Sequence, residues 1–203
     1  MSNMDNPHGF QPWDGVKRAR LYPVQTAPTI AFYHGDLVQA DTTGFASAKL
    51  GVTQLVYDTA VISTTEGATR HILGAVLGVY DEDMNPIPYI APARVGDSTT
   101  AGYLLIADHF YQQYEAQGDG VFAVADIDLN YEITVVALNA GNTSTGISKQ
   151  EICAASGAAV TVTIPLRLYG QAYPKDDVYS AAGCRMICQI NPLCHHYGSG
   201  LAV

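Results

Sequence analysis

Charge is scarce in this sequence. Asp, Glu, Lys and Arg make up only 14% of the 203 residues, whereas they make up roughly 25% of an average soluble domain. The balance is acidic, with 19 acidic and 10 basic residues and a formal net charge of -9. Nucleic-acid binders have the opposite balance, because Lys and Arg displace the counterions of the phosphate backbone. We therefore expect no nucleic-acid partner, and a surface that other subunits partly cover.

Long apolar runs and an export signal are lacking as well. No run approaches the roughly 18 apolar residues of a transmembrane helix, so we expect no membrane partner. The start, MSNMDNPHGF, has neither the basic region nor the apolar segment of a signal peptide. We expect a protein made in a cytoplasm, where its four cysteines are thiols.

Catalytic and cofactor signatures are also missing. There is no GxSxG nucleophile turn, no GxxxxGK[ST] phosphate loop and no GxGxxG after a strand. We therefore expect no cofactor and no enzyme. Asp108 next to His109 places an acid beside an imidazole, a combination that general-base catalysis uses. We interpret these two residues as a strand end and a turn, and keep a hydrolase that uses them as a rival hypothesis.

Cysteine and histidine crowd the C-terminal end, at Cys184, Cys188, Cys194, His195 and His196. They have no CxxC pair, which is the spacing of a strong zinc signal. In an extended strand, one face would carry Cys184, Met186, Cys188 and Ile190. Free cysteine is commonly buried, so we predict a core stripe and no metal site.

Two acidic loops leave a weaker cation site open. Asp126 and Asp128 begin a stretch like a calcium loop, but Tyr131 and Ala137 stand where that loop needs Gly and Glu. The second loop holds Asp81–Asp83. Oxygen-rich loops of this kind bind hard cations in other proteins.

The sequence is rich in short β-branched and aromatic runs separated by turn residues, a pattern typical of an all-β sandwich or barrel. We expect strands within Thr29–Ala40, Leu55–Ser63, Ile72–Tyr80, Val160–Tyr169 and Cys184–Asn191. The stretch Tyr103–Leu138 is expected to hold three or four strands that fold back on each other. We predict a β-barrel or jelly-roll-like sandwich of roughly eight to ten strands, formed by residues 30–203.

Two of these strands predict which side chains share a face. In the strand expected at Ile72–Tyr80, one face should carry Leu73, Ala75, Leu77 and Val79, and the other face Ile72 and Val76. In the strand expected at Val160–Tyr169, one face should carry Val160, Val162, Ile164, Leu166 and Leu168. Gly74 and Gly78 indicate bends or a close backbone approach, and Pro165 indicates an edge strand or a bulge.

Residues 1–29 are predicted to form an extended N-terminal arm, because prolines interrupt them and disfavour a helix. Phe10 and Trp13 would be costly to leave in water, so we expect them to bury against this chain or a neighbour. Lys17, Arg18 and Arg20 form either a solvated charge run or a contact with an acidic partner surface. We predict these five residues as the partner-binding set, and expect a chain lacking residues 1–20 to fold without binding its partner.

Six short motifs resemble segments of one protein family. In chain order they are NMDNPHGFQP from Asn3, FYHGDLV from Phe32, LGAVLGV from Leu73, YEAQGDG from Tyr114, TGIS from Thr145 with LRLYG from Leu166, and Ile190-Asn191 followed by a histidine. Their order and spacing resemble a family of tailed-bacteriophage virion proteins over nearly the whole chain. Trp13 and the Lys17–Arg20 run depart from the family, which has a Gly-rich segment there.

The resemblance implies a structural virion protein, foremost a capsid decoration (cement) protein on the outside of the icosahedral shell. It implies the major capsid protein as partner and synthesis in the cytoplasm of a bacterial host. We expect a homotrimer first and a dimer second. An acidic protein suits the outside of a capsid, away from packaged DNA, and the thirteen tyrosines suit subunit interfaces.

Three other functions remain as alternatives to the capsid decoration role. A minor tail or connector protein would belong to the same particle at lower copy number. A carbohydrate-binding module would use exposed aromatic rings at Tyr111, Tyr114 or Trp13. The hydrolase based on Asp108 and His109 belongs to a different class.

Overall fold

The computed structural model describes residues 3–4, 6–28, 31–41, 51–54, 72–96, 100–134, 141–154, 160 and 164–195. Within these ranges the chain is all-β apart from short 3-10 segments, of which η1 spans Val124–Asp126. The predicted fold class is confirmed. The predicted strand Leu55–Ser63 lies outside the described residues.

Five strands form a small barrel: β2 (Ala19–Gln25), β4 (Leu37–Asp41), β5 (Gly51–Gln54), β6 (Ile72–Tyr80) and β8 (Thr100–Ala107). They follow one another in the order β2-β5-β4-β6-β8, and β8 pairs again with β2. Four of the junctions are antiparallel, while β2 meets β5 in parallel at the single pair Val24 and Val52. That pair closes the barrel.

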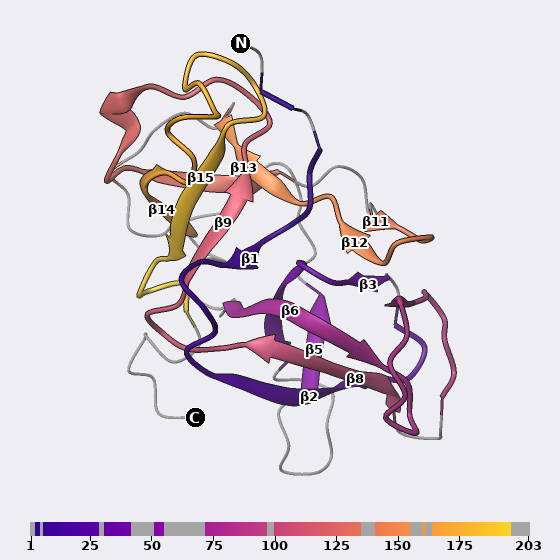
Figure 1. Cartoon of the computed structure of the whole chain (residues 1–203). Helices are drawn as coiled ribbons and strands as arrows, with labels where there is room; N and C mark the ends of the chain where they lie inside the picture. The colour runs from indigo at the N-terminus through magenta and orange to yellow at the C-terminus, as the bar shows by residue number, and fades with distance from the viewer. Residues whose placement is uncertain are drawn as a thin grey trace.

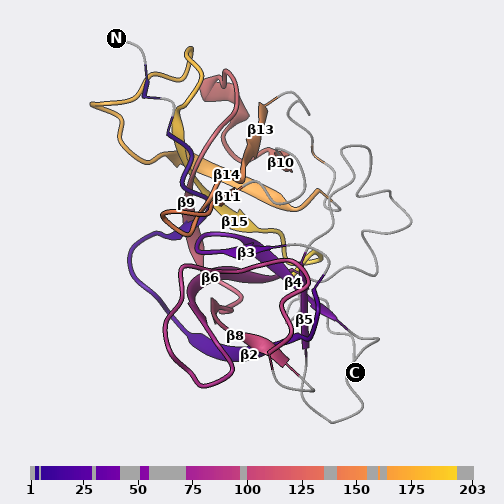
Figure 2. The same cartoon turned by 90° about the vertical axis from the view of Figure 1, so that its right-hand side faces the viewer.

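A six-stranded antiparallel sheet lies beside the barrel, above it in Figure 1, and Figure 2 shows the same two bodies turned by 90°. In sheet order its strands are β1 (Gln11–Pro12), β9 (Gln113–Gln117), β15 (Arg185–Ile190), β14 (Leu166–Gln171), β10 (Asn130–Thr134) and β13 (Glu151–Cys153). Two short ribbons complete the described fold: β3 (Phe32–Tyr33) with β7 (Tyr89–Ile90), and β11 (Gly141–Asn142) with β12 (Ile147–Ser148). The architecture is thus a barrel with an added sheet.

The prediction that Tyr103–Leu138 folds back on itself is wrong. Strand β8 pairs with β2 on one edge and with β6 on the other. Both of its edges are therefore filled, so β9 crosses to the second sheet and pairs with β1 and β15. The run Val121–Val124 forms no strand, because the chain turns there into η1.

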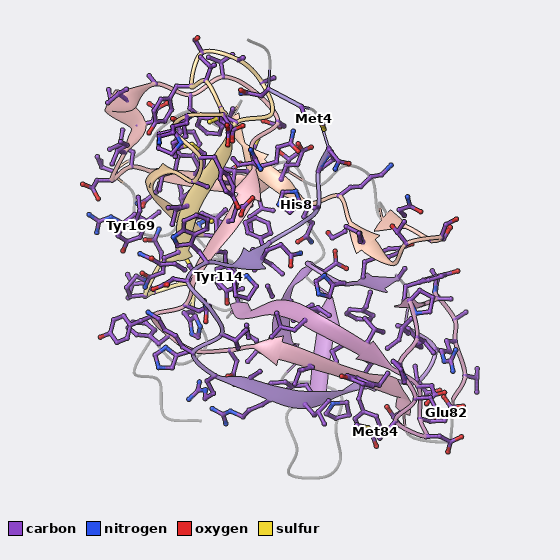
Figure 3. The ribbon with its side chains drawn as sticks, viewed as in Figure 1. Met4, His8, Glu82, Met84, Tyr114 and Tyr169 are labelled. Atoms are coloured by element: carbon purple, nitrogen blue, oxygen red, sulfur yellow. The ribbon has the colours of Figure 1, made fainter. Side chains whose placement is uncertain are left out.

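Two hydrophobic clusters form the core. The first fills the barrel and includes Tyr22, Val24 and Leu104. The second lies under the six-stranded sheet and includes Phe10 and Tyr114. Figure 3 shows Tyr114 between the sheet and the barrel, and its hydroxyl donates to the Ala107 carbonyl, 2.7 Å away. The second cluster therefore joins the two bodies.

Strand β14 confirms only part of the predicted alternation. Leu166 and Leu168 are buried and Arg167 is exposed, as expected. Val160 is exposed, and Ile164 with Pro165 forms a bend before the strand begins. Because proline cannot donate to a ladder, the strand starts after Pro165 and not at Val160.

The stripe of the last strand is confirmed. Cys184, Met186, Cys188 and Ile190 are all buried in the second cluster.

The N-terminal segment runs extended along the body, but it is not separate from it. Strand β1 extends the sheet beside β9, and β2 is a full strand of the barrel. Pro12 fits β1 because this strand lies at the sheet edge, where one side of the backbone needs no partner. The predicted boundary at residue 29 is therefore wrong, and deletion of residues 1–20 would remove Phe10 from the core and the first two residues of β2.

Strand β6 has the predicted bounds, but its side chains do not alternate as expected. Leu73, Val76 and Val79 face the barrel cluster, while Ile72 and Ala75 join the second cluster. Register shifts next to Gly74 and Gly78 rotate the strand between these positions. Gly74 has a φ of +155°, and a Cβ there would lie 1.8 Å from the Ala107 carbonyl oxygen. The close backbone approach predicted for this glycine is confirmed.

We expect Gly74→Ala to lower the free energy of unfolding by about 3 kcal/mol or more, because it adds both overpacking and backbone strain. Gly170 is a matched control, since its φ is +158° but a Cβ there would meet nothing within 4 Å. Gly170→Ala should cost only the strain, about 1 to 2 kcal/mol. Urea unfolding of both variants measures the difference, and equal losses would contradict the close contact at Gly74.

Candidate functional site

Phe10, the first residue of the predicted partner-binding set, is fully buried within this chain. Its ring belongs to the cluster under the six-stranded sheet, and its N–H donates to the Gly35 carbonyl at 2.8 Å. The side chain is therefore committed to the core, and the prediction that it binds a partner is wrong.

Trp13 packs on this chain too. Its ring meets Tyr173 edge to face, with 5.7 Å between ring centres, and its backbone N–H donates to the Gln113 carbonyl. Tyr173 in turn donates to Glu115 at 2.9 Å, and the Arg185 guanidinium stacks 4.0 Å over its ring. Trp13 thus holds the N-terminal segment to the sheet, and it is partly covered.

Arg18 and Arg20 surround a buried carboxylate, Asp108. The Nε of Arg18 donates to Asp108 Oδ1 at 2.7 Å, and the Nε of Arg20 lies 2.9 Å from Oδ2. Tyr22 donates its hydroxyl to Oδ2 at 2.6 Å, and Arg18 also reaches the Asp108 backbone carbonyl at 2.7 Å. A buried charge is tolerated only when it is paired and hydrogen-bonded. The cluster therefore connects the start of β2 to the residue that follows β8.

Lys17 remains at the surface next to this cluster. Its backbone N–H donates to Gln112 Oε1 at 2.9 Å and its ammonium donates to the Tyr111 carbonyl at 2.8 Å. The three predicted cations therefore lie together, while the two predicted aromatic residues pack inside their own chain.

Asp108 and His109 do not form an acid–base pair with each other. The described contacts of the Asp108 carboxylate come from Arg18, Arg20 and Tyr22, while His109 Nδ1 accepts from the Tyr111 N–H at 3.2 Å. The geometry therefore gives the proposed hydrolase no dyad at this position.

The aromatic residues suggested for carbohydrate binding do not gather either. Tyr111 is exposed, but Tyr114 is fully buried. Burial raises the pKa of Tyr114 far above its ordinary value. Tyr114 cannot contact a glycan, and that part of the prediction is wrong.

Burial keeps the C-terminal cysteines in the thiol state. It raises the pKa of Cys184 and Cys194 to about 11, and also raises that of Cys188, so all three are thiols at neutral pH. His195 packs edge-on against Phe110, and His196 lies outside the described residues. Among the described side chains, no three of His, Cys, Asp and Glu gather as metal ligands would.

The acidic loops are internally bonded. Asp81 accepts from the N–H groups of Asp83 and Asn85, and Glu82 pairs with Arg94 at 3.0 Å. In the other loop, Asp126 accepts from the Ala123 N–H and Asp128 pairs with Arg167. Among the described residues, neither loop brings three such side chains together as a cation site would.

A polar junction that the sequence did not predict as a site lies at the turn between β3 and β4. Asp36, which is buried, accepts from the Ser148 hydroxyl at 2.6 Å and from the Tyr33 N–H at 2.8 Å. The His34 N–H donates to the Gly146 carbonyl, and Gln150 accepts from the Leu37 N–H. The Gly-Asp turn was visible in the sequence, but its partner Ser148 lies 112 residues away.

A cavity of about 370 Å³ opens beside this junction. Its walls come from β6, from the loop that holds Pro86 and Pro88, and from the turn at Thr145 and Gly146. His34 and Tyr80 are the ionisable residues among its lining. Burial lowers the pKa of His34, so its ring is neutral at pH 7.

Comparison with known proteins adds no relative. No family model, no curated protein and no solved structure matches this chain. The described residues also contain no helix long and apolar enough to span a membrane.

We expect Asp108→Ala to lower the free energy of unfolding by about 3 to 5 kcal/mol, because it leaves two arginines and a tyrosine hydroxyl without their shared acceptor. Asp128→Asn is the control, because that ion pair is exposed and should contribute less than about 1 kcal/mol, and because Asn, unlike Ala, tolerates the φ of +69° at this position. Chemical unfolding at pH 7 measures both variants. Similar losses would show that the Asp108 cluster does not hold the barrel together.

The junction predicts a pH-dependent stability. Burial raises the pKa of Asp36 from 3.8 to about 7, so the folded chain keeps a proton that the unfolded chain releases. This stabilisation is complete below pH 3.8 and is lost as the pH rises through 7. His8 also makes the fold less stable as the pH rises, because its hydrogen bond to Glu115 raises its pKa.

Comparison of the wild type with Asp36→Asn isolates the Asp36 contribution. Between pH 5 and pH 8, we expect the wild type to lose about 2 to 3 kcal/mol more of its free energy of unfolding than the variant. Asp128→Asn, at an exposed carboxylate, should follow the wild-type profile. Parallel profiles for wild type and Asp36→Asn would contradict a proton held at the junction.

Proposed function

We propose that this chain is a structural protein of a tailed-bacteriophage particle. It binds the outer surface of the icosahedral capsid and stabilises the shell by bridging major capsid protein subunits. It works by burying apolar and tyrosine surface across subunit boundaries, as a homotrimer or a dimer. Many modest contacts on a repeating lattice then add through their effective concentration.

The observation that carries this proposal is a set of exposed apolar side chains on segments at one end of the sheet, Met4, Val121, Val124 and Val178, which we call the apolar end. All four side chains are exposed. Their segments are neighbours, because Asn3 exchanges hydrogen bonds with Val178 and the Phe122 N–H donates to the Tyr179 carbonyl. Figure 3 shows Met4 at the end of the sheet farthest from the barrel.

Exposed aliphatic side chains on neighbouring segments are typical of a binding surface. A chain with only 14% charged residues has few charged side chains to set around them. The acidic net charge of -9 favours the outside of a DNA-filled shell over its inside. The motif resemblance to virion proteins supports the same assignment.

Copy number in purified particles tests this function. Quantitative mass spectrometry against the major capsid protein should find on the order of hundreds of copies in a simple ratio to that protein, because a symmetric lattice repeats its sites. About a dozen copies or fewer would assign the chain to the tail or connector. Finding none in particles would contradict a virion protein altogether.

A further inference from the structure

The outer face of the six-stranded sheet carries a row of polar side chains that crosses three strands. Gln113 of β9, Gln189 of β15 and Arg167 of β14 lie directly opposite one another in the strand register. Residues that lie opposite each other in antiparallel strands project from the same face of the sheet. The next row along the strands is fully buried and consists of Tyr114, Cys188 and Leu168. Because successive side chains alternate between the two faces, the polar row points away from the core.

An exposed aromatic ring, that of Tyr169, borders this row and is held by it. Tyr169 is 39% exposed, and Figure 3 shows it at the edge of the molecule next to β14. Its hydroxyl donates to Gln189 Oε1 at 3.1 Å, and the Arg167 guanidinium lies 5.8 Å from the centre of its ring. Two members of the row therefore fix the ring, which loses little conformational entropy when it binds a partner.

A second exposed ring, that of Tyr111, is connected to the same row. Gln189 Nε2 donates to the Phe110 carbonyl at 3.3 Å. The rings of Phe110 and Tyr111 meet edge to face with 4.6 Å between their centres, and Tyr111 is 60% exposed. One amide, that of Gln189, therefore holds both segments that carry an exposed tyrosine.

The row also keeps hydrogen-bonding capacity for a partner. Gln113 is partly exposed, and no hydrogen bond within the described part of the chain uses its side-chain amide, which can both donate and accept. The Arg167 side chain is 47% exposed and donates one hydrogen bond to Asp128, although a guanidinium has five N–H groups. Donors and an acceptor thus lie next to the two exposed rings.

The charges of this region favour an uncharged partner. Arg167, the charged residue of the row, is paired with Asp128 at 3.0 Å, and Lys17 donates to the Tyr111 carbonyl at the border. The net charge of -9 repels acidic polymers such as nucleic acids and uronate-rich polysaccharides. The two exposed side chains beside the row are tyrosines, which combine an apolar ring with a polar group, whereas those of the apolar end are aliphatic.

We propose that this surface, which we call the glycan face, binds a neutral polysaccharide; its residues are Tyr111, Gln113, Arg167, Tyr169 and Gln189. A pyranose ring presents C–H groups on its faces and hydroxyl groups around its rim. Its faces stack on Tyr169 and Tyr111, and its hydroxyl groups bond to Gln113 and Arg167. Of the three aromatic residues suggested from the sequence, the glycan face includes Tyr111 only. This activity goes beyond the proposed capsid role and does not rest on it.

Affinity gel electrophoresis of the purified full-length chain tests the proposal. Native gels that contain hydroxyethylcellulose, mannan, dextran or galactan supply neutral polysaccharides, and gels that contain polygalacturonate supply an acidic one. We expect at least one neutral polysaccharide to retard the chain and polygalacturonate to leave its mobility unchanged. Unchanged mobility in all four neutral gels, or retardation by polygalacturonate alone, would overturn the glycan face.

Variants of the exposed tyrosines assign the binding to this surface. Tyr169→Ala and Tyr111→Ala each remove a stacking ring outside the core, and we expect each to weaken binding at least about tenfold. Tyr169→Phe keeps the ring and should lose less than Tyr169→Ala. The control, Tyr103→Ala, removes a partly exposed tyrosine from β8 of the barrel and should bind normally. Urea unfolding of each variant verifies that the fold is kept, and normal binding by folded Tyr169→Ala would contradict the proposal.

The outcomes separate this inference from the capsid role. A chain that is absent from particles but is retarded by a neutral polysaccharide loses the proposed function and keeps the glycan face. A chain that is present throughout the lattice but is not retarded keeps the capsid role and loses the glycan face. If Tyr169→Ala weakens binding to particles made without this chain while no polysaccharide retards the wild type, the surface is a protein contact and the glycan face is overturned.

Discussion

The buried carboxylate of Asp108 is the constraint on which the rest of the structure depends. It follows directly after β8, and its oxygens receive hydrogen bonds or ion pairs from Arg18, Arg20 and Tyr22 at the start of β2. A buried charge without these partners would cost several kcal/mol, so the N-terminal segment must reach the barrel for the barrel to form. One residue earlier, the Ala107 carbonyl accepts the Tyr114 hydroxyl. The segment that leaves the barrel for the sheet is therefore held by contacts at both Ala107 and Asp108.

The motifs in the sequence meet one another in space. In the YEAQGDG segment, Glu115 pairs with His8, and Gln117 bonds both to the Asn6 N–H and to the Met4 carbonyl. The FYHGDLV and TGIS segments meet where Asp36 accepts the Ser148 hydroxyl. These motifs thus form contacts that hold distant segments of the chain together. These motifs describe a fold, and the exposed side chains at the apolar end supply the surface from which function is proposed.

The sequence predicted what depends on local pattern. The all-β class, the bounds of β6 and the buried stripe from Cys184 to Ile190 follow from residue type and from the period of two along a strand. It did not predict pairing, because a strand such as β8 shows its own apolar pattern but not which neighbours fill its edges. Among the site residues, the clustering of Lys17 to Arg20 was visible. Their anchor at Asp108 was not, since ninety residues separate Arg18 from Asp108.

We conclude that the N-terminal segment is part of the folded body, with β1 in the sheet and β2 in the barrel. Hydrogen–deuterium exchange of the full chain tests it most directly, because exchange reports the stability of each segment separately. We predict that the amides of Phe10 and of β2 exchange as slowly as those of β8 and β14. If they exchange at the rate of an unstructured peptide while β8 and β14 stay protected, the segment is a detached arm and the account is wrong.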